Sequence, residues 1–528
     1  MLTHMDSTTH EVNDILDRHC RLKPFKHQLH GIHALIKNST FALFDEMGVG
    51  KTKQVIDAAQ VLYTQGKIDR IIIVATTPVR DVWYDEELGE IQKHLWTNQH
   101  ARVTLFHTKN RSWTQRNAGV NLFKACEWII TNYEFIRNLK RLNQLFNLIT
   151  DKTFLVLDES SAIKNYRAQQ TKAAIKIRNK CARVVLLNGT PVTLHPGDMF
   201  SQGQAMDSNI LACKSFFHFR SKYAVLGGFQ GRQIITWRNV EDIQERFKPY
   251  VLRRLKIDCL DLPSKLEPVT ITATLTKDTW SVYKEMRDEM ITWLSVSTVS
   301  IAPQAVVKAL RLSQLTSGFL GGLQAHKPID VNSDYLPGID KPSSDMITPM
   351  TSLPPKEVSR EKLDVFLTWY EDRLNESPNL KLLVWCRFRA ELSRLKLELE
   401  KYKVELGAIH GGQKQHERDR ALRLLDPRTM PEGPVVVTGT PASGSMGLNL
   451  TGAHTVVYLS NDYSLKTRLQ SEDRVHRPGQ TNTVSYFDVV AVGPQGQKTI
   501  DHAVMKSLRK KEDLAMLTTN AWISLLKD

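Results

Sequence analysis

The sequence predicts an α/β protein of two tandem lobes, each built on a parallel sheet. Short runs rich in β-branched residues alternate with helix-patterned segments in two separate stretches, as parallel βα units require. The expected strands of the first stretch are residues 41–44, 71–76, 102–107, 128–131, 154–159 and 183–188. Those of the second stretch are residues 382–386, 406–410, 435–439, 455–460 and 485–490.

The region between the two stretches has a different pattern. Residues 278–293 and 305–315 carry apolar side chains at helical spacing, and residues 327–356 contain six prolines, which favours a linker. We expect five parts in chain order: an N-terminal extension (1–20), a first lobe (21–265) with a helical insertion near 195–250, a helical protrusion with the proline-rich linker (266–356), a second lobe (357–498) and a C-terminal helical brace (499–528).

The charge of the chain suggests a class of partner. The 528 residues carry a net charge of +15. A surplus of this size favours a polyanion such as nucleic acid. On charge alone, a basic soluble protein without such a partner is an equal alternative.

The cysteines and apolar runs indicate the compartment. The six cysteines lie far apart and form no C-x-x-C pair, which argues against a disulfide framework or a zinc ribbon. The N-terminus lacks a signal pattern, and no apolar run is long enough to span a bilayer. We expect a soluble intracellular protein without a structural metal, in the cytoplasm or a host cell, with the nucleus left open.

The first lobe opens with a glycine-rich turn between a strand and a helix. Residues Gly48, Val49 and Gly50 precede Lys51 and Thr52. Glycines allow successive backbone N–H groups to point at phosphate oxygens, and the helix N-terminus adds partial positive charge. Lys51 would reach the β and γ phosphates of ATP, and the Thr52 hydroxyl would ligate Mg²⁺. The alternative is a tight turn with an exposed lysine, since the strict motif requires glycine at position 45, which is aspartate.

Two carboxylates follow an apolar strand further along the first lobe. Asp158 and Glu159 come directly after residues 154–157. The carboxyl ends of parallel strands are where open α/β sheets bind ligands. Asp158 would hold Mg²⁺, and Glu159 would orient and deprotonate an attacking water. The alternative is an acidic helix cap.

The second lobe offers a pair of arginines. Arg474 and Arg477 are three residues apart, so a helix would place both on one face. Guanidinium groups stabilise the charge that grows on a transferring phosphoryl group. Donation from a second domain would make closure a condition for hydrolysis. On spacing alone, two surface arginines at a helix end are the simpler interpretation. Arg387, directly after a second-lobe strand, is an equally open candidate for a phosphate contact.

Taken together, these motifs resemble the Swi/Snf-like ATPases of helicase superfamily two, over roughly residues 22–514. The segments that carry the resemblance, in family order, are L-K-P-F-K-H-Q (22–28), D-E-M-G-V-G-K-T (45–52), T-N-Y-E (131–134), D-E-S-S-A-I-K-N (158–165), N-G-T-P (188–191), L-R-R-L-K-I-D-C-L-D-L-P-S-K (252–265), G-S-M-G-L-N-L (444–450) and Q-S-E-D-R-V-H-R-P-G-Q (470–480). The family's phosphate loop carries aspartate where Asp45 stands.

The resemblance implies two tandem RecA-like lobes with helical insertions between them, and roles for further residues. Gln28 would read the adenine base, Gly447 would bind nucleotide, and Thr131, Asn132 and Asn449 would contact nucleic acid. It also gives Arg474 and Arg477 a catalytic role.

By this resemblance the chain is expected to be an ATP- and Mg²⁺-dependent motor on double-stranded DNA, acting as a monomer without a membrane partner and displacing a DNA-bound protein. Three alternatives remain. One is a helicase that separates strands, and another is a nucleic-acid-binding protein that uses ATP only as a conformational switch. The third, a small-molecule kinase, is disfavoured by the length of the chain and its second lobe.

Overall fold

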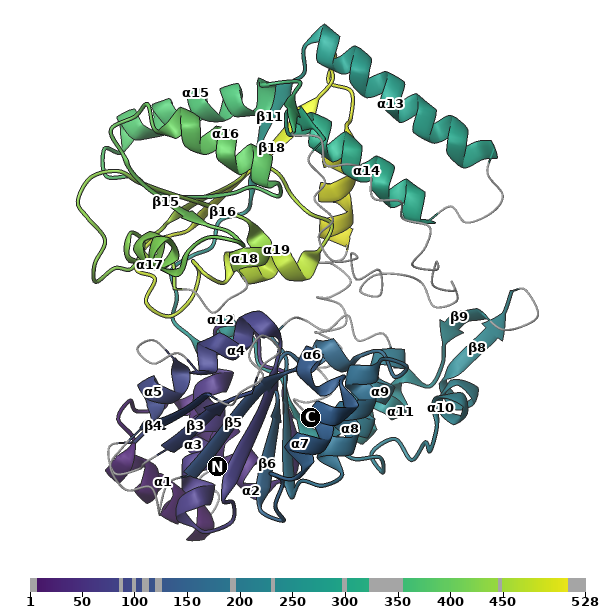
Figure 1. Cartoon of the computed structure of the whole chain (residues 1–528), viewed down its shortest axis with the longest axis vertical. Coiled ribbons are helices and arrows are strands. Elements are labelled where there is room, and N and C mark those ends of the chain that lie inside the picture. The colour runs from purple at the N-terminus through teal and green to yellow at the C-terminus, as the bar shows by residue number, and fades with distance from the viewer. Residues whose placement is uncertain are drawn as a thin grey trace. The chain divides into compact units, whose positions relative to one another are not determined.

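The computed structural model describes residues 7–84, 89–96, 101–106, 114–118, 126–189, 196–228, 233–296, 302–321, 355–444 and 449–510. The chain divides into two compact units, the first ending at Asp261 and the second beginning at Leu262. Each is an α/β unit around its own sheet (Figure 1). Among the helices of the described residues, none is long and apolar enough to cross a membrane.

Unit 1 contains an eight-stranded sheet in the order β10-β1-β7-β6-β2-β5-β3-β4, parallel except for β4 against β3. Its strands are β1 (Thr40–Leu43), β2 (Arg70–Ala75), β3 (Ala101–Leu105), β4 (Thr114–Ala118), β5 (Cys126–Asn132), β6 (Thr153–Leu157), β7 (Arg183–Leu187) and β10 (Val251–Leu252). A separate hairpin joins β8 (Ala224–Gly227) to β9 (Gln233–Trp237).

Helices cover both faces of this sheet (Figure 1). The helices of unit 1 are α1 (Ser7–His19), α2 (Lys26–Lys37), α3 (Lys51–Thr64), α4 (Thr77–Tyr84), α5 (Glu90–His94), α6 (Tyr133–Ile136), α7 (Leu139–Phe146), α8 (Gln169–Arg178), α9 (Pro196–Met206), α10 (Phe216–Tyr223), α11 (Val240–Phe247) and α12 (Lys256–Cys259). Because strand side chains alternate, Ile71 and Ile73 pack with α1–α3, whereas Ile72 and Val74 pack with α6–α11. Burial on both faces explains the unbroken apolar runs of the strands.

Unit 2 contains a parallel six-stranded sheet in the order β11-β18-β17-β14-β16-β15. Its strands are β11 (Val269–Thr274), β14 (Lys381–Trp385), β15 (Glu405–Ile409), β16 (Val435–Gly439), β17 (Thr455–Tyr458) and β18 (Ser485–Val492). Its helices are α13 (Lys277–Val296), α14 (Ala302–Thr316), α15 (Glu361–Glu376), α16 (Arg389–Leu399), α17 (Gln415–Arg423), α18 (Pro441–Gly444), α19 (Leu465–Glu472) and a last helix at residues 500–510. Short strands β12 (Phe319–Leu320) and β13 (Lys356–Glu357) pair beside them.

All eleven strands predicted from the sequence are present, within a few residues of the expected bounds. The two helices predicted between the lobes are α13 and α14, which pack beside β18 through Trp280, Tyr283 and Leu312. The region near 195–250 contains α9–α11 and also the β8–β9 hairpin, which the helical expectation missed. Most of the proline-rich segment at 327–356 lies outside the described residues.

Candidate functional site

The phosphate loop of unit 1 lies between β1 and α3. Gly48 and Gly50 have φ values of 80° and 87°, the left-handed region that favours glycine. Lys51 is the first residue of α3, and its ammonium donates to the carbonyl oxygens of Asp45 at 2.7 Å and Glu46 at 3.0 Å. The lysine therefore lies folded over its own loop at the helix N-terminus, where partial positive charge favours an anion.

Gln28, the predicted base reader, lies against this loop. Its Oε1 accepts from the backbone N–H of Phe25 at 3.0 Å, and its Nε2 donates to the carbonyl of Val49 at 3.3 Å. A Cβ on Gly50 would lie 2.2 Å from that Nε2, so the approach requires glycine. The contact fixes the start of α2 to the loop, and the adenine-reading role of Gln28 stays a prediction.

Asp45 explains how the loop forms without the glycine of the strict motif. Its side chain is fully buried and forms an ion pair with Arg254, a residue that the sequence reasoning did not single out. Arg254 Nε donates to Asp45 Oδ1 at 3.0 Å, and Gln54 Nε2 donates to Asp45 Oδ2 at 3.4 Å. The paired arginines of the L-R-R-L-K segment were the available signal, since a planar guanidinium fits a carboxylate through two hydrogen bonds.

The acidic pair lies at the carboxyl end of β6. Asp158 is buried: Trp83 Nε1 donates to its Oδ2 at 2.8 Å, and the Glu159 backbone N–H donates to its Oδ1 at 2.8 Å. Burial and the charge of Glu159 raise the pKa of Asp158 to about 6, against the Trp83 hydrogen bond and the charge of Lys51. The opposing effect of Lys51 means that the acidic pair and the phosphate loop share one electrostatic environment.

Glu159 has a left-handed backbone with φ 51° and ψ 52°, uncommon for a residue with a side chain. It precedes a 3₁₀ turn, Ser160–Ile163, and its side chain forms no capping hydrogen bond there. The acidic-cap alternative therefore finds no support at this position. Local strain of this kind is concentrated at functional sites.

The strand order explains why these groups meet. β1, β7 and β6 are adjacent and parallel, so the phosphate loop after β1, Asn188 and Gly189 after β7, and the acidic pair after β6 share one edge of the sheet. A Cβ on Gly189 would lie 3.0 Å from the Lys51 ammonium nitrogen. Thr52 and Asp158 at this edge supply hard oxygen donors, which are the ligands that Mg²⁺ takes.

The arginine pair of unit 2 lies in a turn rather than on a helix. The expectation that a helix places both residues on one face is wrong, because α19 ends at Glu472. The His476 amide still donates to the Glu472 carbonyl at 3.0 Å, so the turn continues the helix axis briefly. Pro478 keeps the chain from resuming a helix through Arg477, since a proline disfavours helical backbone in the residue before it.

A buried ionic network supports this arginine turn, which we define as residues 473–477. Arg468 pairs with Glu472 on its own helix and with Asp488 on β18, and its guanidinium carbon lies 3.5 Å from the centre of the Tyr458 ring. Lys265 Nζ reaches Glu472 Oε2 at 2.6 Å. Against the cost of burial, the charges of Arg468 and Lys265 lower the pKa of Glu472 to about 2, so it stays ionised.

The structure separates the predicted nucleic-acid residues into two groups. Thr131 and Asn132 are fully buried, and Asn132 caps α6 by accepting from the Phe135 N–H at 2.7 Å. The side chain of Asn132 is thus used by the first turn of α6, whereas Thr131 Oγ1 is buried without a hydrogen-bond partner among the described residues. The contact of either residue with nucleic acid stays a prediction. Asn449 is exposed, whereas Gly447 lies outside the described residues.

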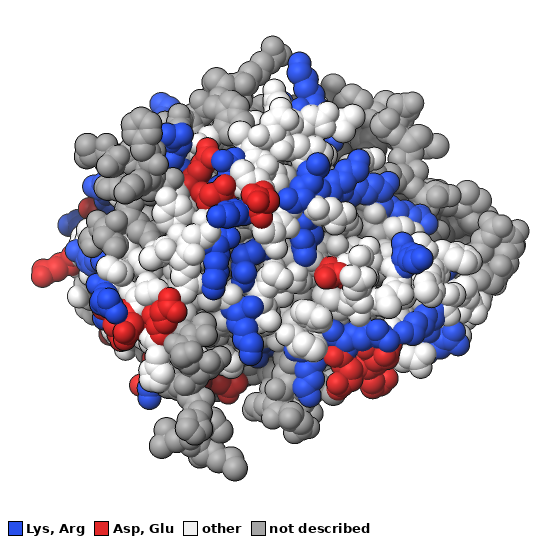
Figure 2. All heavy atoms as spheres, turned by 90° about the horizontal axis from the view of Figure 1, so that it is seen from below, with Lys and Arg blue, Asp and Glu red and all other residues white. Residues whose placement is uncertain are grey.

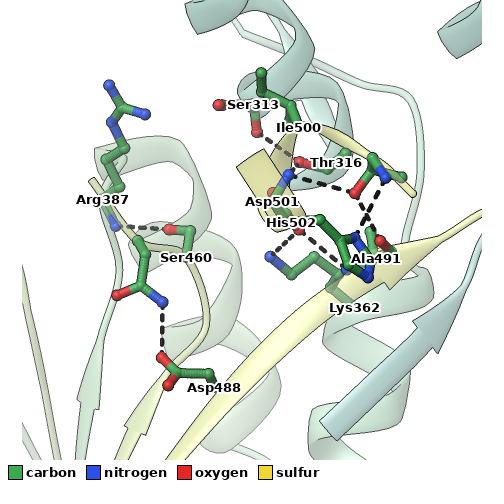
Figure 3. Close-up of polar contacts among 12 residues, drawn as sticks. Ser313, Thr316, Lys362, Arg387, Ser460, Asp488, Ala491, Ile500, Asp501 and His502 are labelled. Carbon is green, nitrogen blue, oxygen red and sulfur yellow. Dashed lines mark hydrogen bonds and ion pairs between the residues drawn. The ribbon is translucent and has the colours of Figure 1, made fainter. Parts of the chain in front are cut away.

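Arg387 is half-buried, and its Nη1 is a buried nitrogen without a hydrogen-bond partner among the described residues. Its backbone N–H donates to Ser460 Oγ at 2.7 Å, which fixes the residue at the end of β14. Its guanidinium extends away from Ser460 and Asp488 (Figure 3). It lies 5.2 Å from the centre of the Phe388 ring.

Part of the basic surplus has a structural role. Figure 2 looks onto the end of unit 1 where its parallel strands begin, and Lys and Arg gather there in bands with smaller acidic groups beside them. Several helices end at this edge. Arg183 donates to the carbonyls of Leu35 and Ile36 in the last turn of α2 and to that of Asn38 just after it. Lys152 donates to the Gly66 carbonyl after α3 at 3.1 Å. Cations there complement helix C-termini, so the net charge alone does not map a nucleic-acid surface.

Comparison with known proteins agrees with this architecture. A SNF2-related domain model matches residues 26–317, and a helicase conserved C-terminal domain model matches residues 361–479. The SNF2 domain-containing protein ENL1 of Oryza sativa subsp. japonica is 24% identical over 523 residues, covering 91% of this chain and 50% of the relative. A SWI/SNF-related matrix-associated actin-dependent regulator of chromatin subfamily A-like protein 1 homolog of Caenorhabditis elegans is 23% identical, covering 96% of this chain and 63% of the relative.

Among solved structures, the Sulfolobus solfataricus SWI2/SNF2 ATPase core in complex with dsDNA matches 90% of this chain and 89% of that chain, with 20% identity and a TM-score of 0.39. The family assignment does not depend on that overlap, because the SNF2-related model alone covers more than half of the chain. The chain belongs to the SNF2-related family, the Swi/Snf-like ATPases of helicase superfamily two.

Proposed function

We propose that this chain is an ATPase stimulated by duplex DNA, and that it moves along the duplex without separating the strands. The observation that carries the proposal is the shared sheet edge of unit 1, where the phosphate loop, Asn188 and the acidic pair end three adjacent parallel strands. The chain spans half to two-thirds of the length of the two relatives described above, so the substrate and partner are inferred from the site.

In this mechanism the triphosphate of ATP lies on the backbone N–H groups of Gly48 to Thr52. Lys51 exchanges its present carbonyl partners, those of Asp45 and Glu46, for phosphate oxygens. The exchange keeps the ammonium hydrogen-bonded throughout, so binding leaves no buried charge without a partner. Gln28 remains on Val49, beside the base.

Thr52 and Asp158 would hold Mg²⁺, which when bound neutralises charge on the phosphates. The raised pKa of Asp158 reflects a buried carboxyl that a nearby cation would stabilise in its ionised form. Glu159, projecting from a left-handed backbone, orients and deprotonates the attacking water. Arg474 and Arg477 complete the site when the units close on ATP, which makes turnover depend on domain movement.

Duplex DNA is the polymer of this proposal, and a protein bound to it would be the object displaced. Membership of the SNF2-related family and the basic surplus support this choice, together with Asn449, which is exposed in unit 2, and the half-buried Arg387. Phosphate contacts from such residues would position the motor without reading sequence. The protein is proposed to act inside the cell as a monomer.

The decisive experiment measures ATP turnover with no polymer, single-stranded DNA, double-stranded DNA and RNA at one stated salt concentration, because phosphate contacts are salt-dependent. We expect duplex DNA to give the largest stimulation. Glu159→Gln should lower the stimulated rate by about 100-fold or more while ATP still binds, because it removes the base. Lys51→Ala should weaken ATP binding itself.

The matched control is Asp151→Asn, an exposed carboxylate just before the start of β6, which should retain full turnover. Full activity of Glu159→Gln would remove its assigned role. Displacement of a third strand with a plain fork left intact supports translocation, whereas opening of the fork would establish the strand-separating alternative. Absence of turnover with every polymer would favour the ATP-switch alternative.

A further inference from the structure

One short segment contacts both the phosphate loop and the arginine turn. We define the strap as residues 252–266, which leave unit 1 and enter unit 2 at Leu262. Its two ends lie in different units, and each end is bonded to the catalytic element of its own unit. The sequence did not predict that this segment contacts the phosphate loop or the arginine turn.

The first end of the strap continues β10, which pairs with β1 in register Leu43↔Leu252. Beyond that pair, alternate residues of the strap are hydrogen-bonded to the segment that leads into the phosphate loop. The Phe44 N–H donates to the Leu252 carbonyl at 2.9 Å, and the Glu46 N–H donates to the Arg254 carbonyl at 2.9 Å. The Lys256 N–H then donates to Glu46 Oε2 at 2.7 Å. The backbone of the loop and the backbone of the strap therefore move together.

Arg254 makes the largest number of side-chain contacts between this end of the strap and the rest of unit 1 among the contacts described here. Its guanidinium pairs with the buried carboxylate of Asp45 and donates to Gln54 Oε1 at 2.9 Å and to the His27 carbonyl. Its partners therefore come from the phosphate loop, from α3 and from the segment of Gln28. A shift of any of these when ATP binds would displace Arg254, because a guanidinium fork tolerates little misalignment.

The second end of the strap contacts the arginine turn. His476, between Arg474 and Arg477, places its Nε2 at 2.8 Å from the Pro263 carbonyl. Lys265 pairs with Glu472 at the end of α19. The Val484 N–H donates to the Ser264 carbonyl at 3.0 Å, and the Leu266 N–H donates to the Val484 carbonyl at 3.0 Å. This end is thus fixed to the strand that follows the turn as well as to the turn itself.

The chain between the two fixed ends is short. From Lys256 to Pro263 there are seven peptide steps, which span at most about 25 Å when fully extended. Residues Lys256–Cys259 form α12, which shortens the reach further because a helix rises only about 1.5 Å per residue. A linker of this length limits the separation of the arginine turn from the phosphate loop.

We infer that the strap is the coupling element of the proposed ATPase, and that Arg254 and His476 are positioning residues that hold its ends. It keeps the arginine turn at a high effective concentration near the phosphates and transmits displacement of the phosphate loop to the second unit. This inference rests on the proposed function, since it requires both units to act on one nucleotide. No family model or relative described above assigns this role to the segment.

The test lengthens the strap. Insertion of four or eight Gly/Ser residues after Asp261 should leave the fold of each unit intact, because the insertion lies between the bonded ends. Chain statistics predict that the effective concentration falls with about the −3/2 power of length, so eight added residues should lower the duplex-stimulated kcat by about threefold or more. The KM for ATP should change less than twofold, since the phosphate loop is untouched.

The matched control inserts the same eight residues at Gly496, a turn position in unit 2 with open space around it. Its kcat should remain within 1.5-fold of the parent. If the strap insertions also stay within 1.5-fold, the strap does not couple the units and the inference fails. If the parent shows no stimulation by duplex DNA, the proposed function fails, and the strap is judged on polymer-free ATP turnover, which should fall in the same order.

A second set of variants distinguishes coupling from simple stability. Arg254→Lys keeps the charge but loses the planar fork, and it should lower the stimulated kcat by about fivefold if the contact transmits motion. Combined with the eight-residue insertion, it should cost no more than the larger of the two single losses, because both changes break the same link. Additive losses in the double variant would assign Arg254 to loop structure only and overturn its positioning role.

Discussion

The phosphate loop of unit 1 and the arginine turn of unit 2 are stabilised in different ways. The loop presents backbone N–H groups, and its shape depends on left-handed glycines and on Arg254 from the strap. The turn presents side chains, and its position depends on Arg468 and Glu472 of the preceding helix together with Asp488 of β18. Both rely on a buried arginine–carboxylate contact, but the loop needs special backbone angles and the turn needs special charges.

The two halves of the proposed site should therefore respond to different substitutions. A backbone-shaped anion site is sensitive to added atoms, because a Cβ collides with neighbours and forces the dihedral angles. A charge-supported turn is sensitive to removed partners, because the remaining ion is left buried without compensation.

Removal of Arg468 should give the largest effect on stability. Its side chain is 8% exposed and lies between two acidic groups. Arg468→Met would leave Glu472 with only Lys265 and Asp488 with only Asn461 among the partners found in the described residues. We expect a loss of about 3–5 kcal/mol in the stability of unit 2, the range for breaking a buried ion pair from one side. Hydrogen exchange of the β17 and β18 amides would measure it. A loss below 1 kcal/mol would show that the turn does not depend on charge.

Glu391 is a second buried carboxyl of unit 2, but unlike Glu472 it has no arginine partner among the described residues. Burial raises the pKa of Glu391 to about 7, against the charge of Lys362 and the hydrogen bond from Ser460. The folded state therefore binds more protons than the unfolded chain between pH 4.5 and about 7, and stability decreases as the pH rises through that window. Glu472, equally buried but paired with Arg468, has its pKa displaced in the opposite direction.

Glu391→Gln should consequently stabilise unit 2 at pH 8 by about 3 kcal/mol, because the parent carboxyl is ionised there although folding raises its pKa from 4.5 to about 7. The difference should shrink toward zero at pH 5, where the parent carboxyl is already protonated. Thermal unfolding of parent and variant at the two pH values would measure it. A gain that is the same at both pH values would contradict the assignment of the effect to ionisation.

Gly50→Ala tests the backbone side of the comparison. The new Cβ would meet Gln28 Nε2 at 2.2 Å on a residue with φ 87°. The left-handed angle costs about 1–2 kcal/mol for an alanine, and relief of the clash requires movement of Gln28 or of the loop. We expect ATP affinity to fall by about tenfold or more, which corresponds to 1.4 kcal/mol. Gly66→Ala is the matched control, because its φ is 66° with no atom within 4 Å of the new Cβ. It should show the backbone cost in stability while ATP still binds.

The sequence predicted the interior of both sheets better than their margins. Apolar runs such as residues 71–75 identify central strands, because burial on both faces leaves a continuous pattern. β10 and β11 escaped prediction, since they owe their pairing to partners more than 200 residues away, at Leu43 and Val489. The two-residue β10 carries no periodicity of its own, whereas β11 alternates apolar residues with threonines, a local signal that was available.

In the candidate site too, features that follow local sequence patterns were predictable, and those that depend on distant residues were not. The phosphate loop and acidic pair follow local patterns, so their places at strand ends could be predicted from the sequence. The partner of Asp45 could not, because Arg254 reaches it only through the pairing of β10 with β1. The predicted helix through Arg474 and Arg477 was wrong because the spacing of two residues does not show where a helix ends, and α19 ends at Glu472.

Removal of Arg360 should give the smallest effect on stability, although Arg360 has three acidic neighbours and Arg468 has two. Arg360 contacts Glu357, Asp364 and Glu398, but its side chain is 44% exposed. Exposed pairs gain little over hydration and lose side-chain entropy, so Arg360→Gln should cost less than about 1 kcal/mol. The same unfolding measurement used for Arg468→Met would check it, with added salt reducing the difference further. A loss as large as that of Arg468→Met would mean that the number of charged partners, rather than their burial, governs the stability of unit 2.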